Sequence, residues 1–344
     1  MSAAGFVRYS GAAIAVALLA ACGAGGSTSP SAPSSGVSGA VEYHDGLAFV
    51  GGRPVTAARP NIGGVTRFPS VPLAPDRRQA RKYLEYIIND YGSYASVFDY
   101  PKSTEQIGTV GDVGGQGCTN VLYGYGSNVV WIVAAYNQIS EYRIPKRLVK
   151  SLSISDGTMP SSCAMNTKGD MAVGLLSGKS AGDMVIFKKA KGAGTFVKTP
   201  LNEEFFDGYD AKGNLFFDGY GGNFVFQLAE IPSGSTTAVP ISTSNFVTFP
   251  GSVQWDGKYV TVLDQISSTI NRYTIAGTTA KLKSQVVLDG ASDCAQTWIV
   301  PGAVFCADAG LDGGEVFSYP GGGKPIATFS GSFDLPLGTT AAAK

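Results

Sequence analysis

The stretch YDAKGNLFFDGYGGNFVFQLAEIPSG, residues 209–234, sets two short apolar runs on either side of glycine-rich turns. Related stretches recur along the chain. They are YGSNVVWIV around Gly126, TKGDMAVGL around Gly169, AKGNLFFDG around Gly213, WDGKYVTVL around Gly257 and VPGAVFCAD around Gly302. The spacings between consecutive glycines are 43, 44, 44 and 45 residues. A nearly constant period of this length, with several short strands in each unit, predicts a β-propeller.

Each unit of the repeat divides into four short strands, in which apolar and polar residues alternate with a period of two. A further unit, at residues 83–110, supplies the second to fourth strands of a blade. Residues 76–88 taken alone also fit a helix. However, when the repeat units are aligned, Asp90 falls at the position that Asp218 has in another unit, which favours strands. The sequence therefore predicts an all-β fold, a six-bladed β-propeller of four-stranded blades over residues 66–344.

The six blades are expected to close into a ring, because an open end would leave an unpaired strand edge and an exposed apolar flank. The C-terminal segment LPLGTTAAAK, residues 335–344, looks like the innermost strand of a further unit that then stops. We expect it to complete the first blade. Residues 70–74, SVPLA, compete for the same place.

The unit YDAKGNLFFDGYGGNFVFQ resembles the NHL-type repeat, with an inner strand, a turn glycine, a strand that ends in Asp and a third strand. The resemblance implies a six-bladed propeller of the NHL/SMP-30-like kind from about residue 83 onward. Three units depart from the pattern, since Gly126 and Gly302 lack the usual preceding polar run, and Leu175 and Leu176 stand where others have Asp. The WD40 repeat fits less well, because the pair Trp255-Asp256 occurs once. The scaffold carries many unrelated activities, so the resemblance implies architecture rather than function.

The chain as a whole is formally neutral, with 26 basic and 26 acidic side chains. Nucleic-acid binding depends on a basic face that displaces counterions from phosphates, so no nucleic-acid partner is expected. The local exceptions are DRRQARK at residues 76–82 and KKAK at residues 188–191. Taken as isolated runs, both are better explained as solvated turns than as phosphate sites.

The N-terminus is typical of an exported protein. Arg8 precedes the apolar run AAIAVALLAA, residues 12–21, which is shorter than the roughly 20 residues of a membrane-spanning helix. The run leads into LAAC, which resembles the bacterial lipoprotein signal, and this resemblance implies that Cys22 is acylated. An ordinary signal peptide with a coincidental Cys22 is the alternative. The absence of an acidic residue after Cys22 favours the outer membrane, since that is where such lipoproteins of Gram-negative bacteria are sent.

The residues after Cys22 are mostly Gly, Ser, Pro and Ala. Such side chains bury too little apolar surface to offset the conformational entropy lost when a chain becomes ordered. We therefore expect residues 1–21 to be a lipoprotein signal peptide and residues 22–65 to be a lipidated flexible tether. The membrane partner would be reached through the N-terminal lipid, in the bacterial cell envelope.

Four other cysteines remain, at positions 118, 163, 294 and 306, and four cysteines allow three pairings. Cys294 and Cys306 flank a predicted hairpin turn at Pro301 and Gly302, which makes them the candidate local disulfide. Free buried thiols are the alternative. No CxxC pair or nearby histidine indicates zinc, and the sequence indicates no metal and no cofactor.

The inner strands of a propeller line its central channel, where binding sites usually lie. The candidate ligand-binding residues on these segments are Asp207, Tyr209, Gln254, Trp255, Asp293, Gln296 and Trp298. Amides and aromatic rings of this kind suit a polar ligand such as a sugar or peptide. For any single residue, packing between blades or contact with channel water is the simpler interpretation. Asn120 and Asn166 belong to the same segments.

Few residues of the predicted propeller could take part in catalysis. The single histidine, His44, precedes the predicted propeller, so no Ser-His-Asp triad is expected in the propeller and no catalytic residue is assigned. Acid-base work would fall to carboxylates, but the pair Glu203-Glu204 is expected in a solvated loop between blades. A recurrent set at the ends of second strands, Asp90, Asp218, Asp264 and Asp308, is expected to accept backbone N–H groups and fix turns rather than bind a metal.

The function that these observations favour is a membrane-anchored, exported lipoprotein whose propeller is a binding or assembly module for a protein, peptide or glycan partner. The alternative is a channel-based enzyme, either a metal-assisted lactonase-like hydrolase or a carbohydrate-active enzyme with two carboxylates. The SMP-30-like lactonases hold a divalent cation with acidic and amide side chains. No set of residues here matches theirs one by one, so no site is carried over.

Overall fold

The computed structural model describes residues 41–44, 47–50, 53–54, 83–89, 94–111, 113–127, 129–134, 137–143, 147–154 and 159–343. The chain divides into two compact units, Met1–Ala58 and Arg59–Lys344. The described part of the first unit is a three-stranded sheet of β1 (Val41–His44), β2 (Leu47–Val50) and β3 (Arg53–Pro54). These strands fall within the range expected as tether. Cys22 and the expected signal peptide lie outside the described residues.

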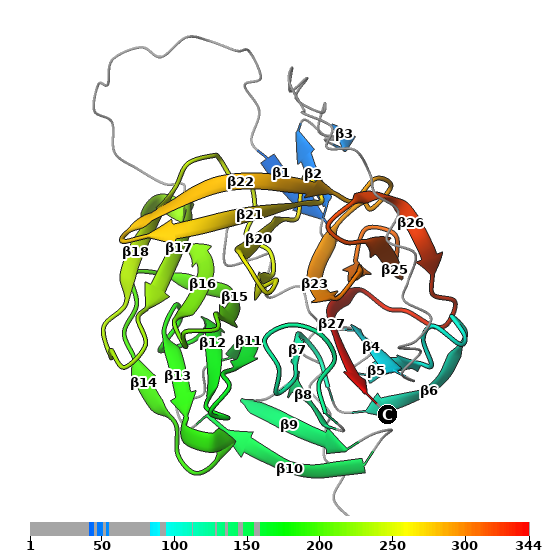
Figure 1. Ribbon diagram of the computed structural model, residues 1–344, viewed down its shortest axis with the longest axis horizontal. Helices are drawn as coiled ribbons and strands as arrows, with labels where there is room; N and C mark the ends of the chain where they lie inside the picture. Colours follow the sequence, from blue (N-terminus) through cyan, green and yellow to red (C-terminus); the bar gives the residue numbers. More distant parts are fainter. Residues whose placement is uncertain are drawn as a thin grey trace, which may run out of the picture. The chain divides into compact units, whose positions relative to one another are not determined.

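The second unit is all-β, with sheets set around a centre in a propeller-like arrangement (Figure 1). In its described residues the only helical pieces are two 3-10 turns, η2 (Lys188–Ala190) and η3 (Gly222–Phe224). No helix among the described residues is long and apolar enough to cross a bilayer.

Four of the sheets have four strands each and follow the order predicted from the repeat, with the inner strand first. One contains β27 (Pro336–Ala343), β4 (Tyr83–Asn89), β5 (Tyr94–Phe98) and β6 (Gln106–Gly111). The next contains β7 (Gly117–Cys118), β8 (Val129–Ala134), β9 (Gln138–Arg143) and β10 (Arg147–Ser153). The third contains β11 (Met159–Met165), β12 (Met171–Ser177), β13 (Met184–Phe187) and β14 (Thr195–Val197). Another contains β23 (Cys294–Val300), β24 (Ala303–Asp308), β25 (Gly313–Ser318) and β26 (Gly322–Thr328).

The remaining sheet has eight strands, where the sequence predicted two blades of four. Its first half is β15 (Glu203–Tyr209), β16 (Leu215–Tyr220), β17 (Phe226–Ile231) and β18 (Val239–Thr243). Its second half is β19 (Val253–Trp255), β20 (Val260–Asp264), β21 (Thr269–Ala276) and β22 (Thr279–Val287). The halves join through two parallel pairs, Ser242 with Thr279 and Thr243 with Ala280. The hairpin of β21 and β22 has strands of eight and nine residues, so its tip reaches β18.

The first sheet is completed by the C-terminus, as predicted. β27 runs antiparallel to β4, with Thr340 opposite Tyr86 and Ala343 opposite Tyr83. Its neighbour β4 is a strand rather than part of a helix, which confirms the choice made from the phase of the repeat. The two ends of the propeller unit are therefore hydrogen-bonded to each other through seven paired positions.

Burial explains the composition of the strands. Every residue of β23 and β24 is buried, because inner and second strands have neighbouring sheets against both faces. The outer strand β22 instead alternates exposed and buried positions, with Lys281 and Lys283 among its exposed residues. Near-continuous apolar runs thus mark the inside of the unit, and alternating runs mark its rim.

Candidate functional site

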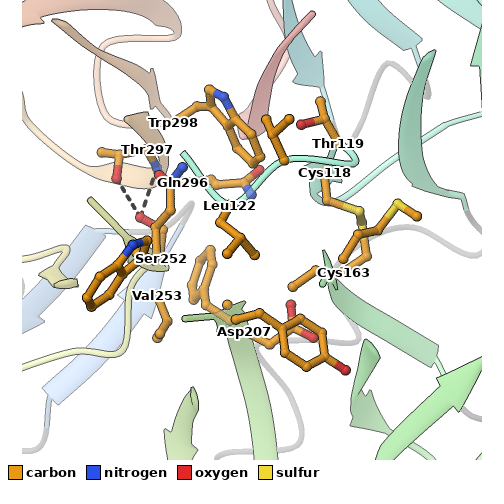
Figure 2. A pocket seen from close by; sticks show the side chains of 18 residues that line it. Cys118, Thr119, Leu122, Cys163, Asp207, Ser252, Val253, Gln296, Thr297 and Trp298 are labelled. Carbon is orange, nitrogen blue, oxygen red and sulfur yellow. Dashed lines mark hydrogen bonds between the residues drawn. A yellow bond between two sulfur atoms is a disulfide. The ribbon is translucent and has the colours of Figure 1, made fainter. Parts of the chain in front are cut away.

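Six of the seven predicted channel residues gather around a central cavity. Asp207, Tyr209, Gln254, Trp255, Gln296 and Trp298 line it from the inner strands β15, β19 and β23 (Figure 2). Asp293, the seventh, lies just before β23 and does not line the cavity. Burial raises the pKa of the Asp293 carboxyl to about 6, and the nearby Asp308 adds to the rise.

The amides in this region hold inner strands together. The side chain of Gln296 donates to the Gly117 carbonyl and accepts from the Gly117 and Thr339 N–H groups, so β23 is tied to β7 and β27. Gln254 makes a similar pair with the backbone of Ile299, donating to its carbonyl and accepting from its N–H. These amides satisfy buried backbone groups, so they are occupied by the protein itself.

A loop covers the cavity from the side of β7. We call residues 119–127, which join β7 to β8, the central loop. Leu122 and Val121 of this loop line the cavity, and the indole N–H of Trp298 donates to the Gly124 carbonyl at 2.9 Å. Figure 2 shows Leu122 among the lining side chains. Gly124 has a φ of +102°, a conformation that glycine adopts without strain.

The free space left in the cavity is about 30 Å³. A water molecule takes about 10–15 Å³ on this measure, so the cavity holds on the order of two waters. Pockets for small molecules usually measure about 300–1,000 Å³. With the central loop in this position, the cavity has no room for a sugar ring or a peptide side chain.

Two buried side chains at the cavity, Asp207 and Thr119, have oxygen atoms without a well-formed hydrogen bond. Asp207 is 7 % exposed. Burial raises the pKa of Asp207 well above its ordinary value, and the neighbouring Glu204 raises it further. The nearby Ser162 hydroxyl only partly offsets this rise in the pKa of the carboxyl. Burial therefore favours the protonated form of this carboxyl over the charged form, relative to an exposed aspartate.

The prediction that Glu203 and Glu204 lie in a solvated loop is wrong. Both belong to β15, where Glu203 is half-buried and Glu204 is fully buried. The Glu204 carboxyl accepts hydrogen bonds from the hydroxyls of Ser161 and Ser162, and a Cβ at Gly174 would occupy its position. Burial raises the pKa of Glu204 to about 8. The sequence signal for this arrangement was Gly174, a glycine inside a strand, which marks a close approach.

The carboxylates at the ends of second strands accept backbone N–H groups, as expected. Asp308 accepts from Leu311 in the turn that follows it, as predicted, and also from Ser292, ahead of β23. Asp264 accepts from Thr248, which precedes an inner strand instead. Asp218 accepts from Gly251, ahead of β19. Asp90 lies outside the described residues. Asn89 accepts from Asp334 ahead of β27, and so takes this role in the first sheet.

Asn120 and Asn166 hold turns. Asn166 accepts from the N–H groups of Lys168 and Asp170 in the β11–β12 turn, and Asn120 accepts from Ser127 within the central loop. Neither residue lines the cavity.

The four described cysteines form two disulfides, Cys118 with Cys163 and Cys294 with Cys306. The first joins the inner strands β7 and β11 and lines the cavity, and the second closes the β23–β24 hairpin around Pro301 and Gly302. Cys294, Cys306 and Asp308 also form a compact group of potential metal ligands, but both sulfurs are engaged in the disulfide.

A larger hollow lies at the rim of the propeller unit. We call it the outer recess. It measures about 380 Å³ and is lined by Val225, Phe226, Thr243, Ser244, Asn245, Phe246 and Val247. None of these residues carries a charge, and the exposed fractions are 79 % for Phe246 and 57 % for Val225. The Asn245 side chain is held in place by hydrogen bonds to Asn271 and Tyr273.

An aromatic cluster continues the recess. Tyr220 contacts the rings of Phe205, Phe224 and Phe249 at centroid distances of 5.2, 6.3 and 5.8 Å. Phe224 is 45 % exposed and has a φ of +54°, a region that bulky residues seldom adopt. Sequence reasoning missed this surface, because it is assembled from the β16–β17 turn and from the segment that follows β18, which are far apart in the repeat.

No protein-family model matches the chain, and no curated protein matches it. The fold is similar to the crystal structure of a protein of unknown function from Bacteroides caccae. The TM-score is 0.58 at 10 % identity, and the match covers 76 % of this chain and 100 % of that one. It is also similar to a chain in the crystal structure of a nidogen/laminin complex, with a TM-score of 0.59 at 11 % identity, covering 76 % of this chain and 98 % of that one. The chain is thus a protein of the β-propeller class, and at these identities the likeness extends to the fold alone.

Proposed function

We propose that this protein is an exported lipoprotein, anchored to a membrane through acylated Cys22, whose propeller binds a protein, peptide or glycan partner at the outer recess. The observation that carries the proposal is the contrast between two hollows. The central cavity has about 30 Å³ of space and amides that are already hydrogen-bonded, whereas the outer recess has about 380 Å³ and exposed aromatic rings.

The chemistry of the outer recess supports an uncharged contact surface. Exposed aromatic side chains give large contact area at low entropic cost and supply much of the binding energy at protein interfaces, and their flat faces also suit sugars. Phe246 and Val225 are exposed together at this recess, and apolar side chains exposed as a patch, unlike a single one, often mark a site of interaction.

The blade count belongs to the same proposal. Taking the eight-stranded sheet as two blades, β15–β18 and β19–β22, gives six blades of four strands, as in the NHL/SMP-30-like propellers. The support is that each half has its own inner strand, and that only two parallel residue pairs join the halves.

The test uses the acylated protein as bait, followed by mass spectrometry of the proteins and small molecules recovered. We expect a partner that is retained by the wild type and lost with Phe246→Ser. The matched control is Ile326→Ser, because Ile326 is also exposed, at 58 %, but lies on β26 away from the recess. A partner that both variants retain equally would contradict the assignment of the recess.

The anchor is tested separately. Cys22→Ser is expected to release the protein from membranes to the soluble fraction, since a single lipid-modified cysteine and the segment after it would be the attachment. Unchanged membrane retention of the variant would contradict lipidation at this residue.

One observation favours the enzymatic alternative. Asp207 offers two carboxylate oxygens without a well-formed hydrogen bond at the central cavity, close enough to Glu204 for the pKa values of the two to interact. This alternative requires the central loop to move. It predicts recovery of a chemically altered small molecule that depends on Asp207, and loss of that product with Asp207→Asn.

A further inference from the structure

We infer that the turns of the β7–β10 and β11–β14 sheets form a basic surface that lies against an anionic membrane. The inference is separate from the outer recess, which belongs to other strands. It begins with the distribution of charge. The whole chain is formally neutral, yet residues 117–198 carry ten Lys and Arg against four Asp and Glu, while residues 199–343 carry six against fourteen.

The fold brings many of these cations to one edge. In the β11–β14 sheet, Met165 pairs with Met171 and Met171 pairs with Phe187, so the turn with Lys168 and the 3-10 turn η2 lie at the same edge. The side chain of Lys150, on β10, donates to the Ala190 carbonyl in η2 at 2.9 Å, which places the neighbouring sheet beside it. The basic surface consists of Arg143, Arg147, Lys150, Lys168, Lys188, Lys189 and Lys191.

Few of these charges are neutralised by the protein. Lys188 pairs with Asp170 at 3.1 Å and Lys150 with Glu141 at 3.3 Å. Lys168, Lys189 and Lys191 are exposed and have no ion-pair partner among the described residues. Unpaired cations gathered at one edge produce a local positive potential that the neutral total conceals.

Exposed apolar side chains stand among the cations. On β10, Leu148 and Val149 directly follow Arg147 and are 54 % and 43 % exposed, and on β14 Phe196 is 39 % exposed. Leu148 and Val149 are exposed at a bulge in the pairing of β10 with β9, between Leu148 and Lys150, which interrupts the alternation on β10. The edge therefore offers cations together with leucine, valine and phenylalanine side chains.

This combination points to a bilayer with anionic headgroups. Basic side chains are drawn to the negative surface potential, and apolar side chains beside them enter the boundary between headgroups and acyl chains. A nucleic acid would use the cations but leave the aliphatic side chains in water. Membrane contact also agrees with the lipid anchor expected at Cys22, since both would hold the chain at a bilayer surface.

The test measures binding of the full chain carrying Cys22→Ser to vesicles, so that acylation contributes nothing. The probes are vesicles of phosphatidylcholine alone and vesicles with 30 mol% phosphatidylglycerol. We expect binding to the second kind only, weakened by 1 M salt, which shortens the screening length to about 3 Å. Each surface lysine contributes about 1 kcal/mol to such binding, so Lys168→Gln, Lys189→Gln and Lys191→Gln together should weaken it about a hundredfold.

The matched control is Lys281→Gln, Lys283→Gln and Lys324→Gln, three exposed lysines on β22 and β26 that change the net charge equally. Its binding should stay within about threefold of the parent, while Leu148→Ser with Phe196→Ser should lower binding without changing its salt dependence. Equal losses in the two lysine triples would overturn the inference, as would no binding to anionic vesicles. Tighter binding to a DNA duplex, insensitive to the two Ser substitutions, would assign the surface to nucleic acid instead.

Discussion

Gln296 offers the sharpest test of how the inner strands are held together. Its side chain is 6 % exposed and satisfies three buried backbone groups, the Gly117 carbonyl at 2.9 Å and the N–H groups of Gly117 and Thr339 at 3.1 and 2.8 Å. Gln296→Leu leaves all three without partners in nearly the same volume. A buried polar group that loses its partner costs about 1–3 kcal/mol, so with three such groups the substitution should lower the free energy of unfolding by roughly 3–9 kcal/mol.

That loss is large beside the total stability of a domain, which is usually about 5–15 kcal/mol. The assay is urea unfolding followed by tryptophan fluorescence, because Trp298 lies two residues from Gln296 on the same strand. Gln138→Leu is the matched control, since Gln138 is exposed on β9 and should change stability by less than about 0.5 kcal/mol. A loss below 1 kcal/mol for Gln296→Leu, similar to that of the control, would refute the view that the amide ties three strands together.

Three further predictions concern buried groups. Gly174→Ala should strongly reduce the yield of folded protein, because the new Cβ would clash with the buried Glu204 carboxyl, which Ser161 and Ser162 hold in place. Gly111→Ala, whose Cβ would have nothing within 4 Å, should be tolerated. The free energy of unfolding should fall by on the order of a few kcal/mol as pH rises from about 4.5 to 8. The reason is that burial raises the pKa of Glu204 to about 8, so the native state keeps a proton that the unfolded chain has released. Glu204→Gln should flatten this pH dependence, and a profile that the substitution leaves unchanged would contradict the role of Glu204. Replacing both Cys118 and Cys163 by Ser should lower the free energy of unfolding by about 4 kcal/mol, and replacing Cys294 and Cys306 by about 3 kcal/mol, because the disulfides close loops of 45 and 12 residues. Equal denaturation midpoints for both variants and the parent would argue against a role of the disulfides in stability.

The repeat made most of the fold predictable from the sequence. A period of 43 to 45 residues placed the turn between the first and second strands of each unit. Even the C-terminal strand β27 could be assigned to the first sheet, because a ring needs every edge paired. The repeat predicts the average length of a strand but not the length of any particular strand. The extended β21–β22 hairpin, which reaches β18 and fuses two expected sheets into one, departs from that average and was therefore not foreseen.

The candidate site was less predictable, for a physical reason. Residue type and strand position place Gln254 and Gln296 at the centre, but whether an amide meets a ligand or a backbone group depends on the distance between inner strands. That distance is set by packing around the whole ring, which no local pattern encodes. The same limit explains Glu204, since its burial depends on Gly174 in a neighbouring sheet, 30 positions earlier in the chain.

In this fold, the polar groups that hold the strands together lie at the centre, and the groups free to bind a partner lie at the rim. At the centre, the amides of Gln254 and Gln296 pair with backbone groups, and the hydroxyls of Ser252 and Thr297 pair with each other at 2.6 Å. The central loop lines the small space that remains. The paired groups gain nothing from a ligand, because each would first have to give up a buried hydrogen bond. At the rim no such cost applies, since Phe246 and the lysines of the basic surface are solvated in the free protein. Binding should therefore be sought at the rim, and the central residues should affect it only through stability.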